Sequence, residues 1–350
     1  DISGSHDLVE EVCRMYGYDN LPTTLLSDTL PPQRENEVVV FEGSVKDILA
    51  DLGLQEVITY RLTTPERESF LLPAGSNAPD ERPYVTLANP ITVDRVAMRH
   101  RLLASVLEVA AANSRVRERL ALCEVGSIYL SSEDGELPDE LSRLAMVLTG
   151  SRDRSHWQAG EPETADFYDL KGIVEGLVSA LGLESISFEA AEHPTFRPGF
   201  TARLMLGKQQ VGWLGELHPL VTEGFDIRVK TAVLAAELDM DALLANKPAD
   251  SRIEPISLFP AVQEDLALLV DQTTTAAAVE EVIRRTGGFL LKSAELFDLY
   301  EGEQVGAGKK SLAYHLTFQS PSKTLTDKDV RKQRQRIIQQ LEKRLGAKLR

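Results

Sequence analysis

The chain has 350 residues, 43% of them hydrophobic and 26% charged, a length that predicts two or three domains and a composition that excludes wholesale disorder. Its formal net charge is −16, and no run of eighteen apolar residues occurs, so a membrane span is not expected. It opens at Asp1 without a basic and apolar leader, which predicts neither a secreted protein nor a complete one.

The N-terminal third combines helices with extended segments. Residues 5–18 carry apolar side chains at helical spacing and predict a helix that Gly17 ends, with an acidic opposite face. Prolines between residues 21 and 32 then predict an extended linker. The next predicted elements are a helix over 36–52, a strand over 54–62, a loop over 73–83 and a helix over 99–112.

The middle of the chain is rich in predicted strands. A polar loop containing Trp157 follows the first two strands, and a helical apolar stripe runs from Leu170 to Leu181. Helices and strands alternate without a repeating βα unit, which predicts an antiparallel α+β domain. The predicted strands lie at 119–130 and 143–149, joined by a turn at 132–135, and then near 185–189, 200–206, 209–215 and 231–238.

A polar, proline-containing stretch at 249–260 predicts a domain boundary. The elements after it are a strand over 265–271, a helix over 276–286, strands over 291–300 and 309–319, a helix over 327–345 and a strand over 347–350. This βαββαβ order is the split ferredoxin-like arrangement. Thr326 and Asp329 form a capping box for the second helix, and Gly346 ends it.

Positive charge concentrates at the C-terminal end. Residues 309–350 hold twelve Lys or Arg and three acidic residues, so the rest of the chain carries −25. An acidic body repels nucleic acid and a basic end attracts it, which predicts RNA contacts in the last domain, although many basic helices are only solvated faces. The candidate RNA-binding residues are Lys309, Lys310, His315, Lys328, Arg331, Lys332 and Arg336.

The strand over 309–319 has two faces. Its large apolar residues from Leu312 to Phe318 alternate on the face expected to be buried. Ala313, His315 and Thr317 share the other face, which predicts a flat surface of small residues where unstacked bases lie while the basic helix holds phosphates. A plain solvated sheet fits these residues equally well.

Acidic residues cluster at the N-terminus. Asp7, Glu10 and Glu11 stand at helical spacings of three and four, so their carboxylates share one turn, and Asp1 lies close enough in sequence to join them. Hard cations such as Mg²⁺ take a few such carboxylates and retain several waters. A merely soluble acidic face remains the alternative.

Signals for catalysis are mostly negative. The sequence has no Gly-rich phosphate loop, nucleophile elbow or zinc-ligand spacing. His218 stands in a turn-like segment and is expected to be a turn or core residue. Cys13 and Cys123 are far apart, which predicts buried small hydrophobic residues in a reducing cytoplasm.

Several long stretches resemble the C-terminal part of the β subunit of bacterial phenylalanyl-tRNA synthetase, and the resemblance runs from Asp1 to Arg350. The stretches that carry it are Asp7–Tyr18, Asn89-Pro90, Met98-Arg99, Leu102-Leu103, Cys123–Gly126, Phe167–Gly172, Gly215–Pro219, Gly308–Tyr314 and Thr324–Asp327. The resemblance implies that residues 1–35 end an upstream helical domain, that 36–248 form a catalytic-like domain of the class II fold, and that 255–350 form a ferredoxin-like anticodon-binding domain.

The resemblance also implies a division of labour. In that family the α subunit binds ATP, makes phenylalanyl-adenylate and transfers phenylalanine to tRNA(Phe), whereas the β subunit's catalytic-like domain has lost its active site. Leu122 stands where a class II enzyme has an ATP-clamping Arg if Glu124 is the glutamate of motif two. This chain is therefore expected to be non-catalytic and to act as part of an α2β2 ligase in the cytoplasm, with exposed apolar helices that pair with the α subunit. The resemblance begins downstream of the family's editing module, so this chain is not expected to proofread.

The family's Mg²⁺ ligands follow a spacing that Asp1, Asp7, Glu10 and Glu11 match, which favours a metal site there, shared with the α subunit. The last domain departs from the family at Gln263 and Glu264, where basic residues are usual, so RNA contacts are not expected at those two positions.

Two other functions remain open. One is a metabolic enzyme with an amino-acid-sensing regulatory domain, which would bind its ligand at a glycine-bearing loop; the corresponding loop here is Asp271–Thr275. The other is a general binder of single-stranded RNA.

Overall fold

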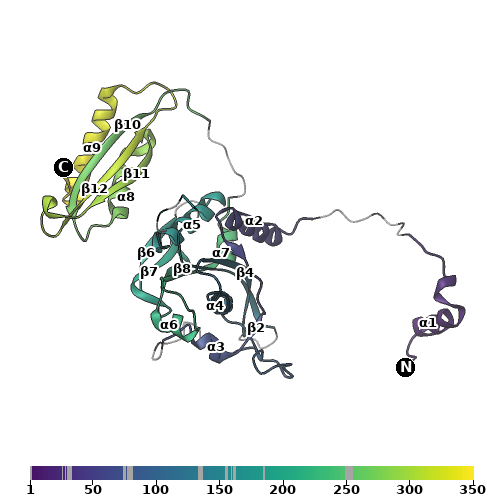
Figure 1. Ribbon diagram of the computed structural model, residues 1–350. Helices are drawn as coiled ribbons and strands as arrows, with labels where there is room; N and C mark the ends of the chain where they lie inside the picture. The colour runs from purple at the N-terminus through teal and green to yellow at the C-terminus, as the bar shows by residue number, and fades with distance from the viewer. Residues whose placement is uncertain are drawn as a thin grey trace. The chain divides into compact units, whose positions relative to one another are not determined.

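The structure is a computed structural model that describes the chain except for residues 1, 26, 28, 30–33, 74–75, 77–81, 133–136, 154–156, 159, 161–162, 184–185 and 249–254. It is an α+β protein of two compact units, Asp1–Ser251 and Arg252–Arg350 (Figure 1). Within the described residues, no helix has the length and apolar character needed to cross a membrane.

The first unit is built on a seven-stranded sheet in the order β1-β4-β5-β9-β8-β7-β6. β1 pairs in parallel with β4, and the other neighbours pair antiparallel, which confirms the predicted α+β class. The strands are β1 Gln55–Glu56, β4 Leu120–Leu130, β5 Asp139–Thr149, β6 Ile186–Ala190, β7 Phe196–Leu206, β8 Gln209–Leu217 and β9 Val233–Asp239.

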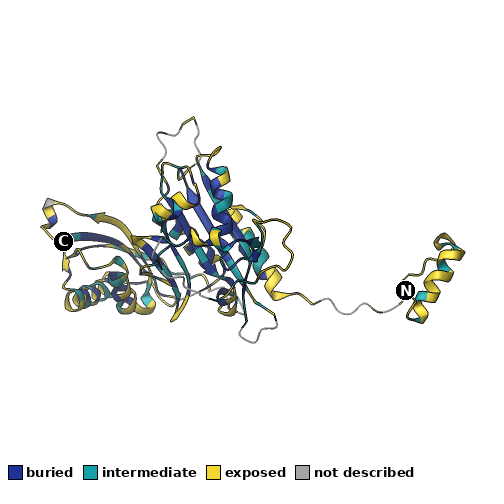
Figure 2. Ribbon diagram, turned by 90° about the horizontal axis from the view of Figure 1, so that it is seen from below, coloured by how far each residue is buried: buried dark blue, intermediate teal, exposed yellow. Residues whose placement is uncertain are grey.

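Helices cover both faces of this sheet. The helices are α2 Glu37–Asp51, α3 Pro65–Ser69, α4 Leu102–Asn113, α5 Phe167–Ala180, α6 Pro219–Gly224 and α7 Met240–Ala245. α2 and α5 pack on one face, and α4 and α6 pack on the other. β5 illustrates the division, since Leu144 and Met146 belong to the first core and Ala145 and Val147 to the second. Figure 2 shows the buried strands between these layers in dark blue.

Two predictions in this unit are wrong. No continuous strand covers 54–62, because the chain leaves the sheet after β1 and then pairs β2 (Leu62–Thr63) with β3 (Ala97–Met98). The helix predicted over 99–112 begins only at Leu102, since Arg99 and His100 are buried before it. The turn at 132–135 and the boundary at 249–260 lie partly outside the described residues.

The second unit has the predicted βαββαβ order. Its elements are β10 Val262–Asp271, α8 Ala276–Gly287, β11 Leu291–Tyr300, β12 Lys309–Phe318, α9 Asp327–Leu345 and β13 Lys348–Leu349. The sheet order β11-β12-β10-β13 is fully antiparallel and ferredoxin-like. Both helices share one core with the strands, and Figure 2 shows them on one side of the sheet. The other side carries no helix among the described residues of this unit.

Local signals set the ends of α9. The Thr326 hydroxyl accepts from the Asp329 N–H while the Asp329 carboxylate accepts from the Thr326 N–H, as the capping box predicts. Gly346 follows the helix in the left-handed conformation, at φ 64°, which a glycine adopts without steric penalty. The helix therefore has the predicted bounds, 327–345.

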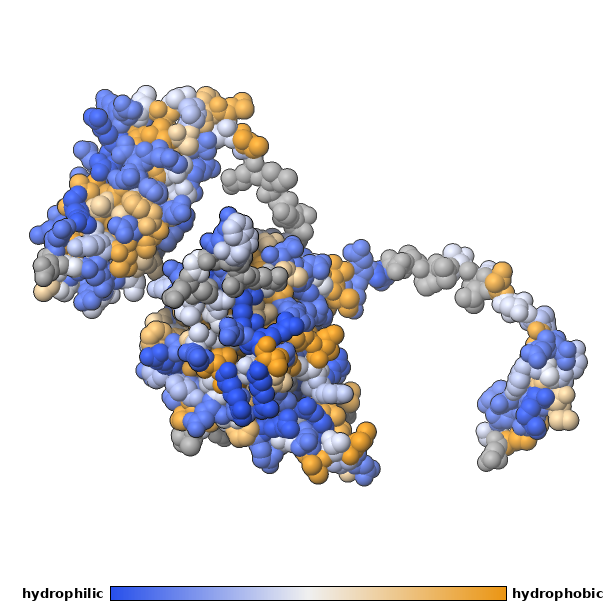
Figure 3. Space-filling model, in the orientation of Figure 1, coloured by the Kyte–Doolittle hydropathy of each residue, from blue (hydrophilic) through white to orange (hydrophobic). Residues whose placement is uncertain are grey.

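α1 (Ser5–Tyr16) begins the chain and ends at Gly17 as predicted. None of its residues is buried, and Leu8, Val9, Val12 and Met15 are each more than half exposed. Figure 3 shows both apolar and hydrophilic residues on its surface. Its apolar stripe is therefore uncovered by the described residues of this chain.

Candidate nucleic-acid interface

The strand register of the second unit separates the residues of β12 between two faces. Leu312, Tyr314 and Leu316 are fully buried under α8 and α9. Ala313, His315 and Thr317 point the other way, toward the face without helices, because neighbours along a strand alternate. We call this second surface the open face.

An aromatic pair lies on the open face. The rings of Phe297 and His315 stack with their centroids 3.8 Å apart and their planes 12° from parallel. Phe297 is 48% exposed, so one ring surface remains accessible to a base. Asp265 on the adjacent strand lies 2.5 Å from Nδ1 of His315 and orients the imidazole. The open face is therefore not the flat surface of small residues that the sequence predicted.

Phe297 reaches this face because of a bulge. Leu296 pairs with Tyr314 and Asp298 pairs with Ala313, which leaves Phe297 as an extra residue between two consecutive ladder positions. Sequence reasoning missed it because strict alternation assigns no face to a bulged residue. The available signal was a large aromatic residue between the charged residues Glu295 and Asp298.

Cationic groups lie near the start of β12, at the other end of the strand from the pair. Arg350, from the segment that follows β13, places its guanidinium 5.3 Å from the ring centre of Tyr300 on β11. Its Nη1 lies 3.4 Å from Oγ of Ser311 on the central strand. Lys309 and Lys310 are half-buried at the start of β12, and Lys309 stands 3.9 Å from Asp271.

The basic residues of α9 lie elsewhere. Lys328, Arg331, Lys332 and Arg336 are all exposed, whereas Val330, Ile337 and Leu341 of the same helix are buried against the sheet. The basic helix face therefore points away from the sheet, opposite to the open face. The expectation that α9 holds the phosphates of bases lying on β12 is wrong for this geometry, because the sheet separates the two surfaces. An RNA that uses both must extend around the edge of the unit.

Gln263 and Glu264 fall on different faces of β10. Gln263 pairs with Thr317 and is exposed on the open face. Glu264 pairs with Leu316, and its carboxylate lies 3.8 Å from the Arg334 guanidinium of α9. Glu264 therefore interacts with the helix layer rather than with the open face.

The predicted metal ligands at α1 do not converge in the described residues. The Asp7 carboxylate accepts hydrogen bonds from the N–H groups of Ser3 and Gly4, which lowers the pKa of Asp7 and keeps it ionised. The Glu11 carboxylate pairs with Arg14 instead of turning toward Asp7. No group of three possible ligands forms within the described part of the chain, and Asp1 lies outside it. Their carboxylate oxygens are nevertheless the donors that Mg²⁺ prefers.

The catalytic-like unit uses its predicted motif residues for structure. Glu124 forms a buried ion pair with Arg99 at 3.1 Å, and Leu122 is buried in the core under α4. His218 is a turn residue as predicted, since its Nδ1 accepts from the N–H of Leu220 at the start of α6. Cys123 is buried as expected, whereas Cys13 on α1 is only half-buried.

The loop proposed for amino-acid sensing forms a turn and the N-terminal cap of α8. Thr274 turns back to Asp271 through a backbone hydrogen bond, and the Thr275 hydroxyl accepts from Ala278 N–H to cap α8. The loop holds no glycine. The regulatory-domain alternative is therefore not supported.

Comparisons with known proteins agree with this architecture. Residues 21–240 match the family model of the phenylalanyl tRNA synthetase beta chain CLM domain, and residues 257–350 match the ferredoxin-fold anticodon binding domain. Three curated relatives are phenylalanine–tRNA ligase beta subunits, from Halalkalibacterium halodurans (40% identical), Geobacillus kaustophilus (39%) and Bacillus cereus (38%). Each alignment covers 100% of this chain and 42–43% of the relative, so the chain spans less than half their length.

Among solved structures, a pyrrolysyl-tRNA synthetase from Desulfitobacterium hafniense aligns with a TM-score of 0.46 at 13% identity, over 59% of this chain and 68% of that chain. The two family models together cover residues 21–240 and 257–350, in the order that the two units follow. The chain belongs to the phenylalanyl-tRNA synthetase beta chain family.

Proposed function

We propose that the chain is a non-catalytic portion of the β subunit of phenylalanine–tRNA ligase. It pairs with the α subunit in an α2β2 assembly of the cytoplasm and binds tRNA(Phe), while the α subunit binds ATP and attaches phenylalanine. Family membership supports this assignment, and so do the structural roles of Leu122 and Glu124 in the catalytic-like unit. The chain alone is expected to have no aminoacylation activity.

The observation that carries the RNA-binding part is the Phe297–His315 stack on the open face of a domain that matches anticodon-binding domains. A half-exposed aromatic ring stacks on an unpaired base, and each such contact contributes about 1–3 kcal/mol. Arg350 adds positive charge on the same face. In this proposal unpaired anticodon bases lie on the open face, and Lys309 and Lys310 contact the RNA backbone at the start of β12. The RNA extends around the edge of the unit, where other phosphates contact α9 at Lys328, Arg331, Lys332 and Arg336.

Mobility of tRNA in a native gel tests this part. The chain should retard tRNA(Phe) more strongly than an unrelated tRNA of equal length, and binding should weaken steeply with added salt because phosphate contacts release counterions. Equal affinity for both RNAs would favour a general single-strand binder instead.

An exposed apolar surface on the first unit supports the proposed α partner. Ile58 is 88% exposed and Tyr60 is 75% exposed, and both line a shallow hollow of about 300 Å³ with Val109 of α4. Contiguous exposed apolar residues of this kind mark protein interfaces. Ile58→Asp should abolish co-elution with a separately purified α subunit, whereas Leu258→Asp, at an equally exposed leucine of the second unit, should not.

We also propose that Asp1, Asp7, Glu10 and Glu11 bind Mg²⁺. The spacing of Asp7, Glu10 and Glu11 on one helical turn and the ionised state of Asp7 support the site. Binding requires Glu11 to leave Arg14 and requires Asp7 to share its oxygens with the metal.

A further inference from the structure

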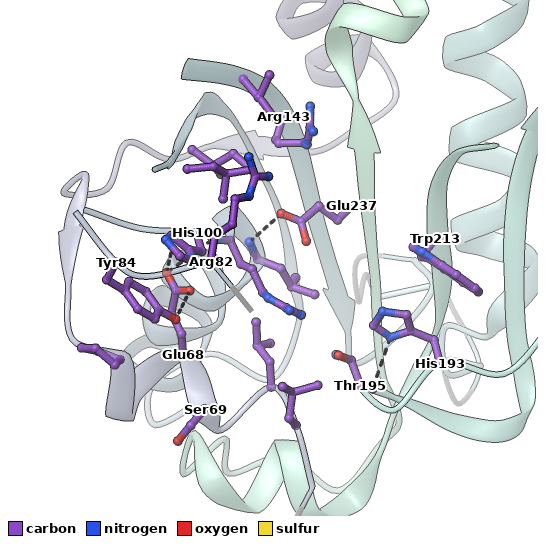
Figure 4. Close-up of a pocket in the computed structure, with 18 of the residues that line it drawn as sticks. Glu68, Ser69, Arg82, Tyr84, His100, Arg143, His193, Thr195, Trp213 and Glu237 are labelled. Atoms are coloured by element: carbon purple, nitrogen blue, oxygen red, sulfur yellow. Dashed lines mark hydrogen bonds between the residues drawn. The ribbon is translucent and has the colours of Figure 1, made fainter. Parts of the chain in front are cut away.

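A cavity of about 650 Å³ opens on the α4 side of the seven-stranded sheet. Its volume suits a small organic molecule. Figure 4 shows two groups of residues across it, with Glu68, Tyr84 and His100 on one side and His193, Thr195 and Trp213 on the other. Apolar residues of the strands, among them Ile128, Leu130 and Leu141, complete the wall.

The acidic groups in this cavity are already engaged. The Glu68 carboxylate accepts from the N–H groups of His100 and Arg101 and from the Tyr84 hydroxyl. Glu237 accepts from the N–H groups of Leu102 and Leu103 at the start of α4. Neither carboxylate forms an ion pair with a lining arginine among the described residues, so both act as caps for backbone donors.

Two hydrogen-bond donors in the cavity have no partner within the described chain. Arg101 is half-buried, and among the residues that the structure describes its guanidinium forms no hydrogen bond or ion pair. The Thr195 hydroxyl also lacks a partner although Thr195 is only 2% exposed, and Figure 4 shows its oxygen directed toward the cavity. An unsatisfied buried hydroxyl is unfavourable, and a bound acceptor removes that penalty.

The positive charge of Arg101 affects the pKa of a residue on each side of the cavity, His193 and Glu68. Burial lowers the pKa of His193 to about 4, and the positive charge of Arg101 contributes to this shift. Burial raises the pKa of Glu68 to about 7, against hydrogen bonds from Tyr84, Arg101 and His100 and the charge of Arg101. Arg101 is therefore placed to attract an anion between the two groups, beside a neutral His193.

The charges that line the cavity limit which anion fits. Three arginines line it, but Arg82 pairs with Asp139, and Arg143 pairs with Asp239 and Asp241. The Arg101 guanidinium and one hydroxyl then match a planar monoanionic carboxylate, which a guanidinium binds through two parallel N–H groups. A phosphate dianion requires more hydrogen-bond donors than these two groups supply, and the Glu237 carboxylate lines the same cavity. The wall of Ile128, Leu130, Leu141 and Trp213 favours an apolar or aromatic body on the ligand.

We propose that this cavity is a binding site for a small organic monocarboxylate with an apolar body, held by the Arg101 guanidinium and the Thr195 hydroxyl. The carboxylate occupies the space between Arg101 and Thr195, and the apolar body packs on the strands of the sheet. The site is independent of the RNA-binding face, so its failure leaves the proposed tRNA function untouched.

Calorimetric titration of the full 350-residue chain with 3-phenylpropanoate tests the proposal. Binding should be saturable, whereas 3-phenylpropylamine, with the opposite charge, should not bind, and phenyl phosphate should bind at least about tenfold more weakly. Arg101→Gln should weaken 3-phenylpropanoate binding at least about tenfold, the effect of losing a charged hydrogen-bond partner. Thr195→Val should weaken it about tenfold, the effect of losing one hydroxyl hydrogen bond to a charged acceptor.

Two controls keep the result interpretable. Arg115→Gln removes an exposed arginine that pairs with Asp226 outside the cavity and should leave the affinity unchanged. Thr195→Val should also raise the melting temperature of the ligand-free chain, because it removes an unsatisfied hydroxyl, so weaker binding cannot be ascribed to unfolding. Absence of saturable binding, equal binding of the amine, or unchanged affinity in Arg101→Gln would each overturn the proposal.

Discussion

Arg99 and Glu124 form a buried ion pair, 3.1 Å between Nη1 and Oε1, at the base of the seven-stranded sheet. Their side chains are 2% and 4% exposed. Thr59 completes the group, since its hydroxyl accepts from Arg99 and donates to Glu124. Gly126 leaves the space for the guanidinium, because a Cβ at that position would lie 2.4 Å from Nη2 of Arg99. Two of the family-like motifs, Met98-Arg99 and Cys123–Gly126, thus meet in one structural cluster.

Arg99→Met should destabilise the first unit by about 3–5 kcal/mol, because it leaves the Glu124 carboxylate buried without its cation. Urea unfolding followed by tryptophan fluorescence measures this unit alone, since Trp157 and Trp213 both belong to it. Arg115→Met is the matched control, because Arg115 and Asp226 are exposed and water and salt screen their ion pair, so its loss should cost far less stability. Equal losses in the two variants would contradict a structural role specific to the buried pair.

Phe297→Ala should lower the affinity for tRNA(Phe) by about 1–3 kcal/mol, the contribution of one base stacked on an aromatic ring. Phe289→Ala removes a ring that is 78% exposed in the same unit, outside the stack, and should leave the affinity unchanged. Filter binding at fixed salt gives both values. The stack has no role in RNA binding if the two variants bind alike.

Reversal of Arg331, Lys332 and Arg336 to glutamate should reduce the slope of log affinity against log salt by about two to three, since each phosphate contact contributes about 0.7–0.9. Phe297→Ala should shift the same line downward without changing its slope, because stacking releases no counterions. The comparison separates the two surfaces that the structure places on opposite sides of the sheet. An unchanged slope in the triple variant would exclude α9 from the RNA contacts.

Glu10→Gln should abolish the heat of Mg²⁺ binding if α1 holds the metal, because Glu10 is a proposed ligand whose loss leaves the helix cap at Asp7 intact. Glu37→Gln, at an exposed glutamate at the start of α2, is the control for charge. Calorimetric titration of both variants and the parent chain checks the site. Equal Mg²⁺ affinity in Glu10→Gln and the parent would remove Glu10 from the ligand set.

Sequence patterns predicted the second unit better than the first, for a physical reason. α9 has its predicted bounds because a capping box and a left-handed glycine are local signals that tertiary contacts do not override. The start of α4 was misplaced because Arg99 is held outside the helix by Glu124, a residue 25 positions away. The short helices α3, α6 and α7 were missed, since five or six residues show no apolar period.

Some features of the candidate site were likewise predictable from the sequence, and others were not. The exposure of Lys328, Arg331, Lys332 and Arg336 follows from helical periodicity and was predictable. The stack of Phe297 on His315 was not, because the bulge that brings the ring to the open face depends on the pairing of two strands. The arrangement of Arg101 and Thr195 around one cavity also joins residues from segments far apart in the sequence.

Stability of the first unit should depend on pH through Glu68. Burial raises the pKa of Glu68 to about 7, well above its ordinary value of 4.5, so the folded chain holds its proton more tightly than the unfolded chain does. Its stabilising contribution is therefore complete below pH 4.5 and is lost as the pH rises to about 7, a change on the order of 3 kcal/mol. His193, whose pKa burial lowers to about 4, acts in the opposite direction, because its contribution is lost as the pH falls from 6.5 to 4.

The difference in unfolding free energy between the parent chain and Glu68→Gln isolates the glutamate, since both carry His193. The unfolding free energy of the parent minus that of Glu68→Gln should be larger at pH 5 than at pH 8. Urea unfolding followed by tryptophan fluorescence measures both values. A difference that stays constant between these pH values would show that Glu68 titrates normally in the folded protein.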